Sequence, residues 1–469
     1  MKSKILFFLL LFFLAGNSLA TGSKMQLSES TEKRLEWFKD AKFGLFLVWG
    51  LYSVPEGVLP NGKPVKKYAE WYQIASGISA SEYARLTEKF NPVKFDADEL
   101  VKKAKNTGFK YITITAKFHD GFAMWPSSHS SFNIKLTPFH KQNPNRDLLM
   151  ELRKACDKYG LKLVYYYSQV KDWHHYDAWH GQNSSATKTL FPGINEKQNH
   201  ENYISKIMLP QLSELVGKYR ADGIWFDTPG QWNNSRQLAE RVVRTVRKIN
   251  PDCLINSRLI HKSVNENSYW DLIDYSVLGD GGKGSFVNRP WYGETPAMGQ
   301  MNTYSYHSQR KWHKPKLLIS KLIHAVCNDY NFLLTVGQHA DGSLPKEDDK
   351  VLTEIQKWMT EYSDAIHGTR GLPATLIKKI SDNDLRLCSK SNKIYVFSNE
   401  QQTVSFEYSV LSSNKLKKVY RLTDKQEIQS VISGSKITFT PVLSKPGSYE
   451  VTVLEFEKSI QKQEAAGKK

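Results

Sequence analysis

Asp227 is the residue best placed for chemistry, because it directly follows the short apolar run at residues 223–226 (GIWF). A carboxylate with aromatic neighbours and little water around it suits a nucleophile that attacks the anomeric carbon of a sugar. The competing interpretation makes Asp227 the N-cap of a helix, since residues 228–230 (TPG) resemble a loop that enters one. Taken alone, Asp227 is a candidate catalytic carboxylate.

Further residues able to bind a sugar lie at or near the ends of other apolar runs. Trp49 and Tyr167 end two such runs, His119 follows a third, and Glu70 and Trp71 lie in the long connection after the first. Aromatic rings, an imidazole and carboxylates, without a glycine-rich phosphate loop, are typical of a carbohydrate site. Each residue alone has a structural interpretation, so the prediction depends on the collection.

The elements that must position these residues read as parallel strands alternating with helices. Helical patterns at 97–106 and 146–159 are each followed by a glycine that closes them. The buried-strand patterns are 43–49, 111–115, 163–167, 223–226, 253–256 and 333–336. This alternation, kept up for about 300 residues, predicts a (β/α)8-like TIM barrel whose active site lies at the C-terminal ends of the strands.

The pattern changes after about residue 370 into short strand-like runs separated by polar turns. Such runs are typical of an antiparallel β-sandwich. The length of 469 residues accommodates both units. We therefore expect a catalytic barrel over residues 26–368, a C-terminal sandwich over 371–456 and a polar tail over 457–469.

Residues 1–20 read as a cleaved signal peptide, in which Lys2 and Lys4 precede the apolar run 5–15 and small residues follow it. The run is too short to span a bilayer and no later run is long enough, so we expect no membrane anchor. The protein is expected to be exported, to the periplasm or the medium. The short signal and the lysine-rich composition indicate a bacterial source.

The chain is basic, with 65 Lys and Arg against 47 Asp and Glu and a formal net charge of +18. Such a surface attracts polyanions, but the lysines are scattered and no nucleic-acid motif is present, so nucleic acid is not a predicted partner. His174, His175 and His180 match no usual metal-ligand spacing, and we predict neither a metal nor a cofactor. The widely spaced cysteines read as isolated thiols: Cys156, Cys253, Cys327 and Cys388.

Several blocks of the sequence, in order and spacing, resemble the signature segments of the α-L-fucosidases, the family 29 glycoside hydrolases. The blocks are 37–55 (WFKDAKFGLFLVWGLYSVP), 70–72 (EWY), 115–125 (TAKFHDGFAMW), 222–227 (DGIWFD), 256–258 (NSR), 331–337 (NFLLTVG) and 365–370 (AIHGTR). The resemblance implies a (β/α)8-like barrel followed by a β-sandwich. It also implies a retaining double displacement at a terminal α-L-fucosyl linkage, with a fucosylated oligosaccharide or polysaccharide as substrate.

The resemblance also assigns roles to residues. Asp227 matches the nucleophile, and Glu294, in the block 291–297 (WYGETPA), matches the acid/base of one large group of the family. A retaining pair of carboxyl groups lies about 5 to 5.5 Å apart. Residues expected to hold the sugar are Trp49, Glu70, Trp71, His119, Tyr167, Trp225 and Arg258.

Two positions depart from the family pattern, because Val48 and Phe118 stand where the family usually has histidines that bind sugar hydroxyls. An unpaired hydroxyl costs about 1 to 3 kcal/mol of recognition. These departures, with the basic surface, favour a sulfated fucose or a galactose-like sugar from an acidic polysaccharide. Two alternatives stay open: an α-L-galactosidase with the same mechanism, and a catalytically silent carbohydrate-binding protein.

Overall fold

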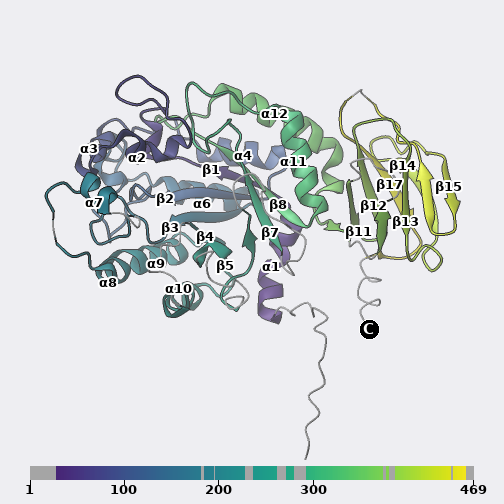
Figure 1. Cartoon of the computed structure of the whole chain (residues 1–469), viewed down its shortest axis with the longest axis horizontal. Coiled ribbons are helices and arrows are strands. Elements are labelled where there is room, and N and C mark those ends of the chain that lie inside the picture. The colour runs from purple at the N-terminus through teal and green to yellow at the C-terminus, as the bar shows by residue number, and fades with distance from the viewer. Residues whose placement is uncertain are drawn as a thin grey trace, which may run out of the picture.

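The computed structural model describes residues 28–180, 184–194, 196–227, 236–260, 271–278, 292–372, 376–379, 386–444 and 447–460. The predicted signal peptide and residues 461–469 of the tail lie outside this part of the chain. Within it, no helix is long and apolar enough to cross a membrane. The chain forms an α/β unit with a smaller all-β unit beside it (Figure 1).

The α/β unit is built on eight parallel strands in the order β5-β4-β3-β2-β1-β8-β7-β6, so that strands close in sequence are neighbours in the sheet. Strands β1, β2 and β8 are buried at every residue, as expected for a sheet with both faces covered. The bounds are β1 Phe43–Leu47, β2 Tyr111–Lys117, β3 Lys162–Ser168, β4 Gly223–Asp227, β5 Leu254–Ile255, β6 Ser276–Val277, β7 Gly293–Ala297 and β8 Tyr330–Val336.

The two end strands of this sheet, β5 and β6, meet and close it into a barrel. A parallel bridge joins Asn256 to Tyr275, just after β5 and just before β6. The backbone N–H of Ser257 donates to the carbonyl of Tyr275 at 2.8 Å, and the N–H of Asp274 donates to the carbonyl of Ile255 at the same distance. The predicted barrel is therefore confirmed, with β5 and β6 as its shortest strands.

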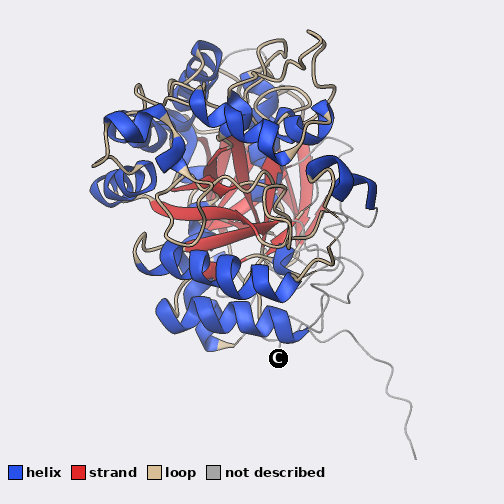
Figure 2. Cartoon of the chain, turned by 90° about the vertical axis from the view of Figure 1, so that its left-hand side faces the viewer, coloured by secondary structure: helices blue, strands red, loops and turns tan. Residues whose placement is uncertain are grey.

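Helices surround the sheet (Figure 2). The two predicted from glycine-terminated patterns are α4 and α6, and both end at a glycine in the left-handed conformation, Gly108 with φ 99° and Gly160 with φ 74°. The bounds are α1 Glu29–Ala41, α2 Tyr72–Ser76, α3 Ala80–Ala84, α4 Ala97–Thr107, α5 Pro138–Gln142, α6 Leu148–Tyr159, α7 Ser184–Leu190, α8 His200–Tyr203, α9 Leu209–Gly217, α10 Arg236–Ile249, α11 Pro315–Cys327 and α12 Lys346–Tyr362.

The all-β unit consists of two antiparallel sheets, with strand orders β10-β13-β16-β15 and β14-β17-β12-β11-β9. It lies beside α11 and α12 (Figure 1), and Trp358 of α12 donates its indole N–H to the carbonyl of Tyr449 at 3.1 Å. The bounds are β9 Arg370–Gly371, β10 Ile377–Lys379, β11 Arg386–Lys390, β12 Lys393–Ser398, β13 Val404–Tyr408, β14 Leu416–Arg421, β15 Ser430–Ser433, β16 Lys436–Phe439 and β17 Glu450–Phe456. This arrangement is the predicted β-sandwich.

Candidate active site

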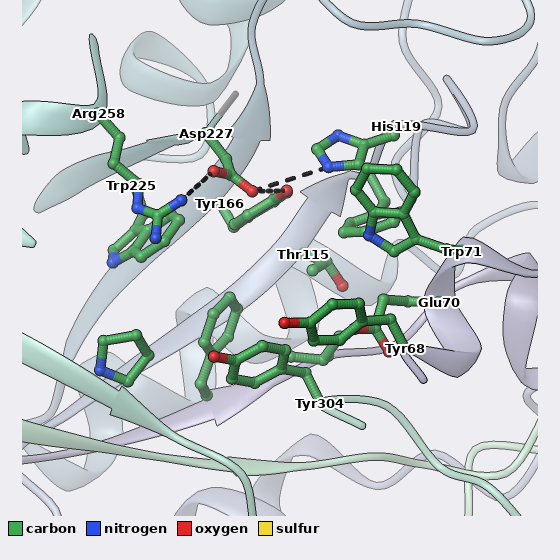
Figure 3. Close-up of a pocket in the computed structure, with 14 residues that line it drawn as sticks. Tyr68, Glu70, Trp71, Thr115, His119, Tyr166, Trp225, Asp227, Arg258 and Tyr304 are labelled. Atoms are coloured by element: carbon green, nitrogen blue, oxygen red, sulfur yellow. Dashed lines mark hydrogen bonds and ion pairs between the residues drawn. The ribbon is translucent and has the colours of Figure 1, made fainter. Parts of the chain in front are cut away.

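A pocket opens where the C-terminal ends of the barrel strands converge (Figure 3). Because parallel strands end at the same edge of a barrel, side chains far apart in the sequence meet there. The lining residues are Phe46, Val48, Tyr68, Glu70, Trp71, Thr115, Phe118, His119, Tyr166, Trp225, Asp227, Arg258, Pro296 and Tyr304. Six of the nine predicted site residues are among them: Glu70, Trp71, His119, Trp225, Asp227 and Arg258.

Asp227, the last residue of β4, has both carboxylate oxygens held. Arg258 donates from Nη1 to Oδ1 at 2.7 Å, and the Tyr166 hydroxyl donates to Oδ2 at 2.7 Å. The side chain is 14% exposed. Charge-assisted bonds of this kind favour the ionised carboxylate and fix its orientation. The structure therefore presents Asp227 as an anion at the pocket wall.

Arg258 lies in a short 3-10 turn, Ser257–Leu259, that follows the end of β5. Its backbone carbonyl accepts a hydrogen bond from Gln169 Nε2 at 2.8 Å, and its guanidinium lies 5.2 Å from the ring centroid of Trp225. A guanidinium stacked on an aromatic ring is held in one orientation. This packing directs Arg258 toward Asp227.

His119 presents a hydrogen-bond acceptor to the pocket. The Ser168 hydroxyl donates to the carbonyl of Lys171 at 2.7 Å, so Ser168 Oγ accepts a hydrogen bond from the N–H at His119 Nδ1, also at 2.7 Å. Burial first, and then the charge of Lys171, hold the pKa of His119 well below its usual value, so the ring is neutral. A neutral imidazole protonated at Nδ1 has a lone pair at Nε2, which lies 3.8 Å from Asp227 Oδ2. We infer that Nε2 accepts a hydrogen bond from a sugar hydroxyl.

Glu70 is the second carboxyl group that lines the described pocket, and it lies across the pocket from Asp227 (Figure 3). Its Oε2 accepts hydrogen bonds from the backbone N–H and hydroxyl of Ser305 at 3.2 and 3.0 Å and from the Thr303 hydroxyl at 3.1 Å. Burial raises the pKa of Glu70, and the Ser305 and Thr303 bonds oppose that shift. These hydrogen bonds to Oε2 hold the carboxyl group of Glu70 in place.

Aromatic rings form much of the remaining wall. The Trp71 ring meets His119 edge to face at 5.3 Å, and Tyr68 and Tyr304 stack in parallel with ring centroids 5.9 Å apart. Flat rings of this kind pack against the apolar faces of sugars. Tyr68 and Tyr304 were not among the predicted site residues, because each lies in a loop with no strand pattern before it.

The two positions that depart from the family pattern both line the pocket. Val48 follows β1, and Phe118 follows β2 and stacks on Tyr166 with centroids 5.7 Å apart. Together with Phe46, they make an apolar patch beside the hydrogen-bonding groups. A sugar in this pocket therefore meets apolar side chains where two histidines are expected from the family pattern.

Glu294, the predicted acid/base, lies on β7 in the barrel interior and is completely buried. Its Oε1 accepts from the Tyr111 hydroxyl and its Oε2 from the Trp225 indole N–H, each at 2.6 Å. Burial raises the pKa of Glu294 to about 7. Pro296, two residues further along the same strand, lines the pocket, whereas Glu294 does not. The structure thus does not bring Glu294 to the described pocket beside Asp227, and its acid/base role stays a prediction.

Two predicted sugar-binding residues also lie outside the pocket. Trp49 is completely buried, and its indole N–H donates to the carbonyl of His339 at 3.0 Å. Tyr167 donates from its hydroxyl to Gln211 at 2.7 Å, on the other side of β3 from Tyr166. Because side chains alternate along a strand, the residue that reaches Asp227 is Tyr166. On β3, Tyr166 lines the described pocket and Tyr167 does not.

Within the described residues, no group of three or more His, Cys, Asp or Glu side chains is placed to hold a metal ion. None of the four cysteines forms a disulfide in the described part of the chain; three of them are buried, and Cys327 is partly exposed.

The sequence of the chain is similar to those of known proteins. A sequence model of the family described as "Alpha-L-fucosidase" matches residues 16–364. The chain belongs to the α-L-fucosidase family. It is 26% identical over 360 residues to an α-L-fucosidase of Dictyostelium discoideum, covering 71% of both chains.

The fold of the chain is also similar to those of solved fucosidase structures, over 71 to 91% of the chain in the two examples that follow. The fold matches a GH29 α-L-fucosidase of Bacteroides thetaiotaomicron, trapped as a covalent intermediate with 2-fluoro-fucosyl fluoride, with TM-score 0.77 and 25% identity over 91% of this chain and 96% of that one. An α-L-fucosidase of Lactobacillus casei in complex with its α-L-fucose product is 31% identical, with TM-score 0.62, over 71% of this chain and 99% of that one.

Proposed function

We propose that the protein is an exported, exo-acting α-L-fucosidase that works by retaining double displacement, with Asp227 as nucleophile. The observation that carries this proposal is the carboxylate of Asp227, held by Arg258 and Tyr166 at 2.7 Å each in a pocket lined by aromatic rings. The covalent intermediate trapped in the Bacteroides relative supports the same route. Residues 1–20 support export, because their sequence has the features of a signal peptide.

In the first step, a carboxylate oxygen of Asp227 bonds to the anomeric carbon as the bond from that carbon to the aglycone oxygen breaks. The leaving oxygen takes a proton from a general acid. In the second step, the same group, now a base, removes a proton from water, which attacks the anomeric carbon and releases Asp227. Arg258 and Tyr166 keep Asp227 ionised and oriented, and His119 Nε2 accepts from a sugar hydroxyl.

A modified sugar is the second candidate substrate, favoured by one observation. Val48 and Phe118 give the pocket apolar surface at two positions where the family pattern has histidines. A fucose with substituted hydroxyls leaves fewer hydroxyls without a hydrogen-bond partner at these positions. An L-galactose-type sugar, which differs from fucose by one hydroxyl, changes which hydroxyls need a partner. Fucosylated glycans remain the first candidate, and the substituted sugars are the finer proposal.

Trapping of the glycosyl-enzyme tests the proposal. The wild type, incubated with 2-fluoro-fucosyl fluoride, should gain the mass of one fluorofucosyl group on a peptide that contains Asp227. Asp227→Asn should gain none and should hydrolyse 4-nitrophenyl α-L-fucoside at least about 10³-fold more slowly. The control is Tyr167→Phe, which should be labelled like the wild type because its hydroxyl bonds outside the pocket. A label on another carboxylate would remove Asp227 from this role.

A further inference from the structure

Lys171 is a buried lysine next to the pocket, and the described residues give it no ion-pair partner. It lies in the segment after β3 and is 9% exposed. Its ammonium sits over two indole rings, 4.7 Å from the Trp71 centroid and 5.4 Å from that of Trp179. Trp71 lines the pocket, so the ammonium of Lys171 packs on a side chain that forms part of the pocket wall.

The other buried lysines in the described part of the chain are paired. Lys42 Nζ lies 3.1 Å from Asp329, and Lys117 Nζ lies 3.3 Å from Asp172. For Lys171 Nζ, the described residues provide neither an ion pair nor a hydrogen-bond acceptor. The two indole faces are its nearest partners, and Asp227 attracts it from a greater distance. A desolvated ammonium without an anion is unfavourable, and cation–π contacts offset only part of that cost. Lys171 is therefore the exception among these lysines.

The charges around the pocket do not neutralise Lys171. Asp227 is already paired with Arg258, and Glu70 accepts hydrogen bonds from Ser305 and Thr303 on the other side. His119 is neutral, and the charge of Lys171 helps to keep it so. Burial lowers the pKa of Lys171 to about 8 even though the charge of Asp227 opposes the shift. The ammonium is thus close enough to interact with both groups of the site without being bound by either.

We propose that Lys171 binds an anionic substituent, a sulfate ester or a carboxylate, on the glycan whose terminal sugar occupies the pocket. This inference rests on the proposed function, since it names the substrate class of the same site. An anion at Lys171 provides the missing counter-charge, and the indole planes of Trp71 and Trp179 keep the ammonium in place before the ligand arrives. The apolar patch of Val48 and Phe118 fits a sugar with fewer free hydroxyls.

Binding measurements test this inference without requiring turnover. Isothermal titration calorimetry would compare L-fucose with its 2-, 3- and 4-O-sulfates, and a fucosyl-uronic acid disaccharide with its neutral counterpart, on the wild type and Lys171→Met. Methionine keeps the length of the stem and removes the charge. We expect the wild type to prefer at least one anionic ligand over its neutral counterpart at least tenfold, and Lys171→Met to lose that preference. Whether the sulfates or the uronic acid show the effect identifies the source of the anion.

The matched control is Lys162→Met. Lys162 also sits over a tryptophan, 5.7 Å from the Trp37 centroid, but at the opposite end of β3, where it pairs with Asp222 at 2.8 Å. Lys162→Met changes the net charge by the same amount as Lys171→Met, and it should keep the wild-type preference for the anionic ligand. Lys171→Arg should keep most of it.

The inference is overturned if the wild type binds every neutral ligand as tightly as its anionic counterpart, or if Lys171→Met keeps the preference. Failure of the proposed function looks different. In that case neither neutral nor sulfated aryl fucosides are hydrolysed, and 2-fluoro-fucosyl fluoride leaves Asp227 unlabelled, whatever the calorimetry shows.

Discussion

The indole N–H of Trp225 donates a hydrogen bond of 2.6 Å to Glu294, and Trp225 itself lines the pocket. The tryptophan therefore separates the carboxyl group of Glu294 from the space in which a sugar would bind. A general acid must come within hydrogen-bond distance of the glycosidic oxygen. In this arrangement Glu294 lies outside the described pocket, and its acid/base role stays a prediction.

Glu294→Gln is the direct test of that arrangement. If Glu294 stays outside the pocket when a sugar binds, kcat/KM for an aryl α-L-fucoside should fall by less than about tenfold, since glutamine can still accept the Trp225 bond. Added azide should then not raise the rate, because the side chain does not line the pocket. Recovery of turnover with formation of a fucosyl azide would contradict this expectation and establish Glu294 as the acid/base. Glu70→Gln, measured in parallel, shows whether the carboxyl that lines the pocket has that role.

Tyr166→Phe should lower kcat/KM while the fold is retained. The change removes one of the two donors to Asp227, and a hydrogen bond to a charged group contributes about 1.5 to 3 kcal/mol, which corresponds to roughly 10- to 100-fold in rate. Tyr167→Phe is the matched control on the same strand, because its hydroxyl bonds Gln211 outside the pocket. It should lower the free energy of unfolding by about 1 kcal/mol and leave kcat unchanged. Equal kinetic effects of the two variants would rule out a specific role for Tyr166.

Phe118→His should improve hydrolysis of unsubstituted fucosides. A histidine at this position can pair with a sugar hydroxyl that otherwise meets an apolar ring, and one such bond is worth about 1 kcal/mol or more, roughly fivefold or more in kcat/KM. Substituted fucosides should lose activity in the same variant. Phe122→His serves as control, because Phe122 is buried outside the pocket and its replacement should affect stability alone. A fall in activity on both substrate classes would speak against the proposed origin of the specificity.

The buried carboxyl of Glu294 should make stability depend on pH. Burial raises its pKa to about 7, whereas a glutamate in an unfolded chain titrates near about 4.3, so the folded state keeps this proton over a range in which the unfolded chain has lost it. This contribution to stability is complete at low pH and is lost as the pH rises toward 7.

Urea unfolding of the wild type and Glu294→Gln at pH 5 and pH 8 measures the effect. Relative to the wild type, the variant should gain about 2 to 3 kcal/mol between the two conditions, because glutamine has no proton to lose. Asp120, whose pKa burial also raises to about 7, is present in both proteins, and its effect cancels. A difference that is the same at both pH values would show that Glu294 does not titrate in this range.

Much of the fold could be predicted from the sequence, because the buried parallel strands stand out as apolar runs ending in polar residues. The positions of β2, β3 and β4 follow directly from such runs. The face of each strand could not be predicted in the same way. Strands buried on both sides have no alternation of apolar and polar residues, so Tyr166 and Tyr167 are indistinguishable in the sequence.

The candidate site was predictable where a residue ends a strand, as Asp227 does, and less so elsewhere. Glu294 was identified by resemblance, with no strand predicted around it. Its depth in the barrel depends on Tyr111 and Trp225, which are distant in sequence. Lys171 gives no sequence signal at all, because a lysine becomes unusual only when the structure shows what surrounds it.

The sandwich has an apolar core of its own, but one of its sheets also packs against the barrel unit. Side chains of its five-stranded sheet, among them Tyr395, Phe397 and Val453, belong to the same apolar cluster as the barrel, and Tyr362 of α12 donates to Glu450 at 2.7 Å. Heating should therefore melt the two units in one calorimetric transition, with matching van't Hoff and calorimetric enthalpies. The rate at which the barrel unfolds then depends on the sandwich as well. A substitution that loosens the sandwich should therefore also shorten the time for which the pocket stays folded.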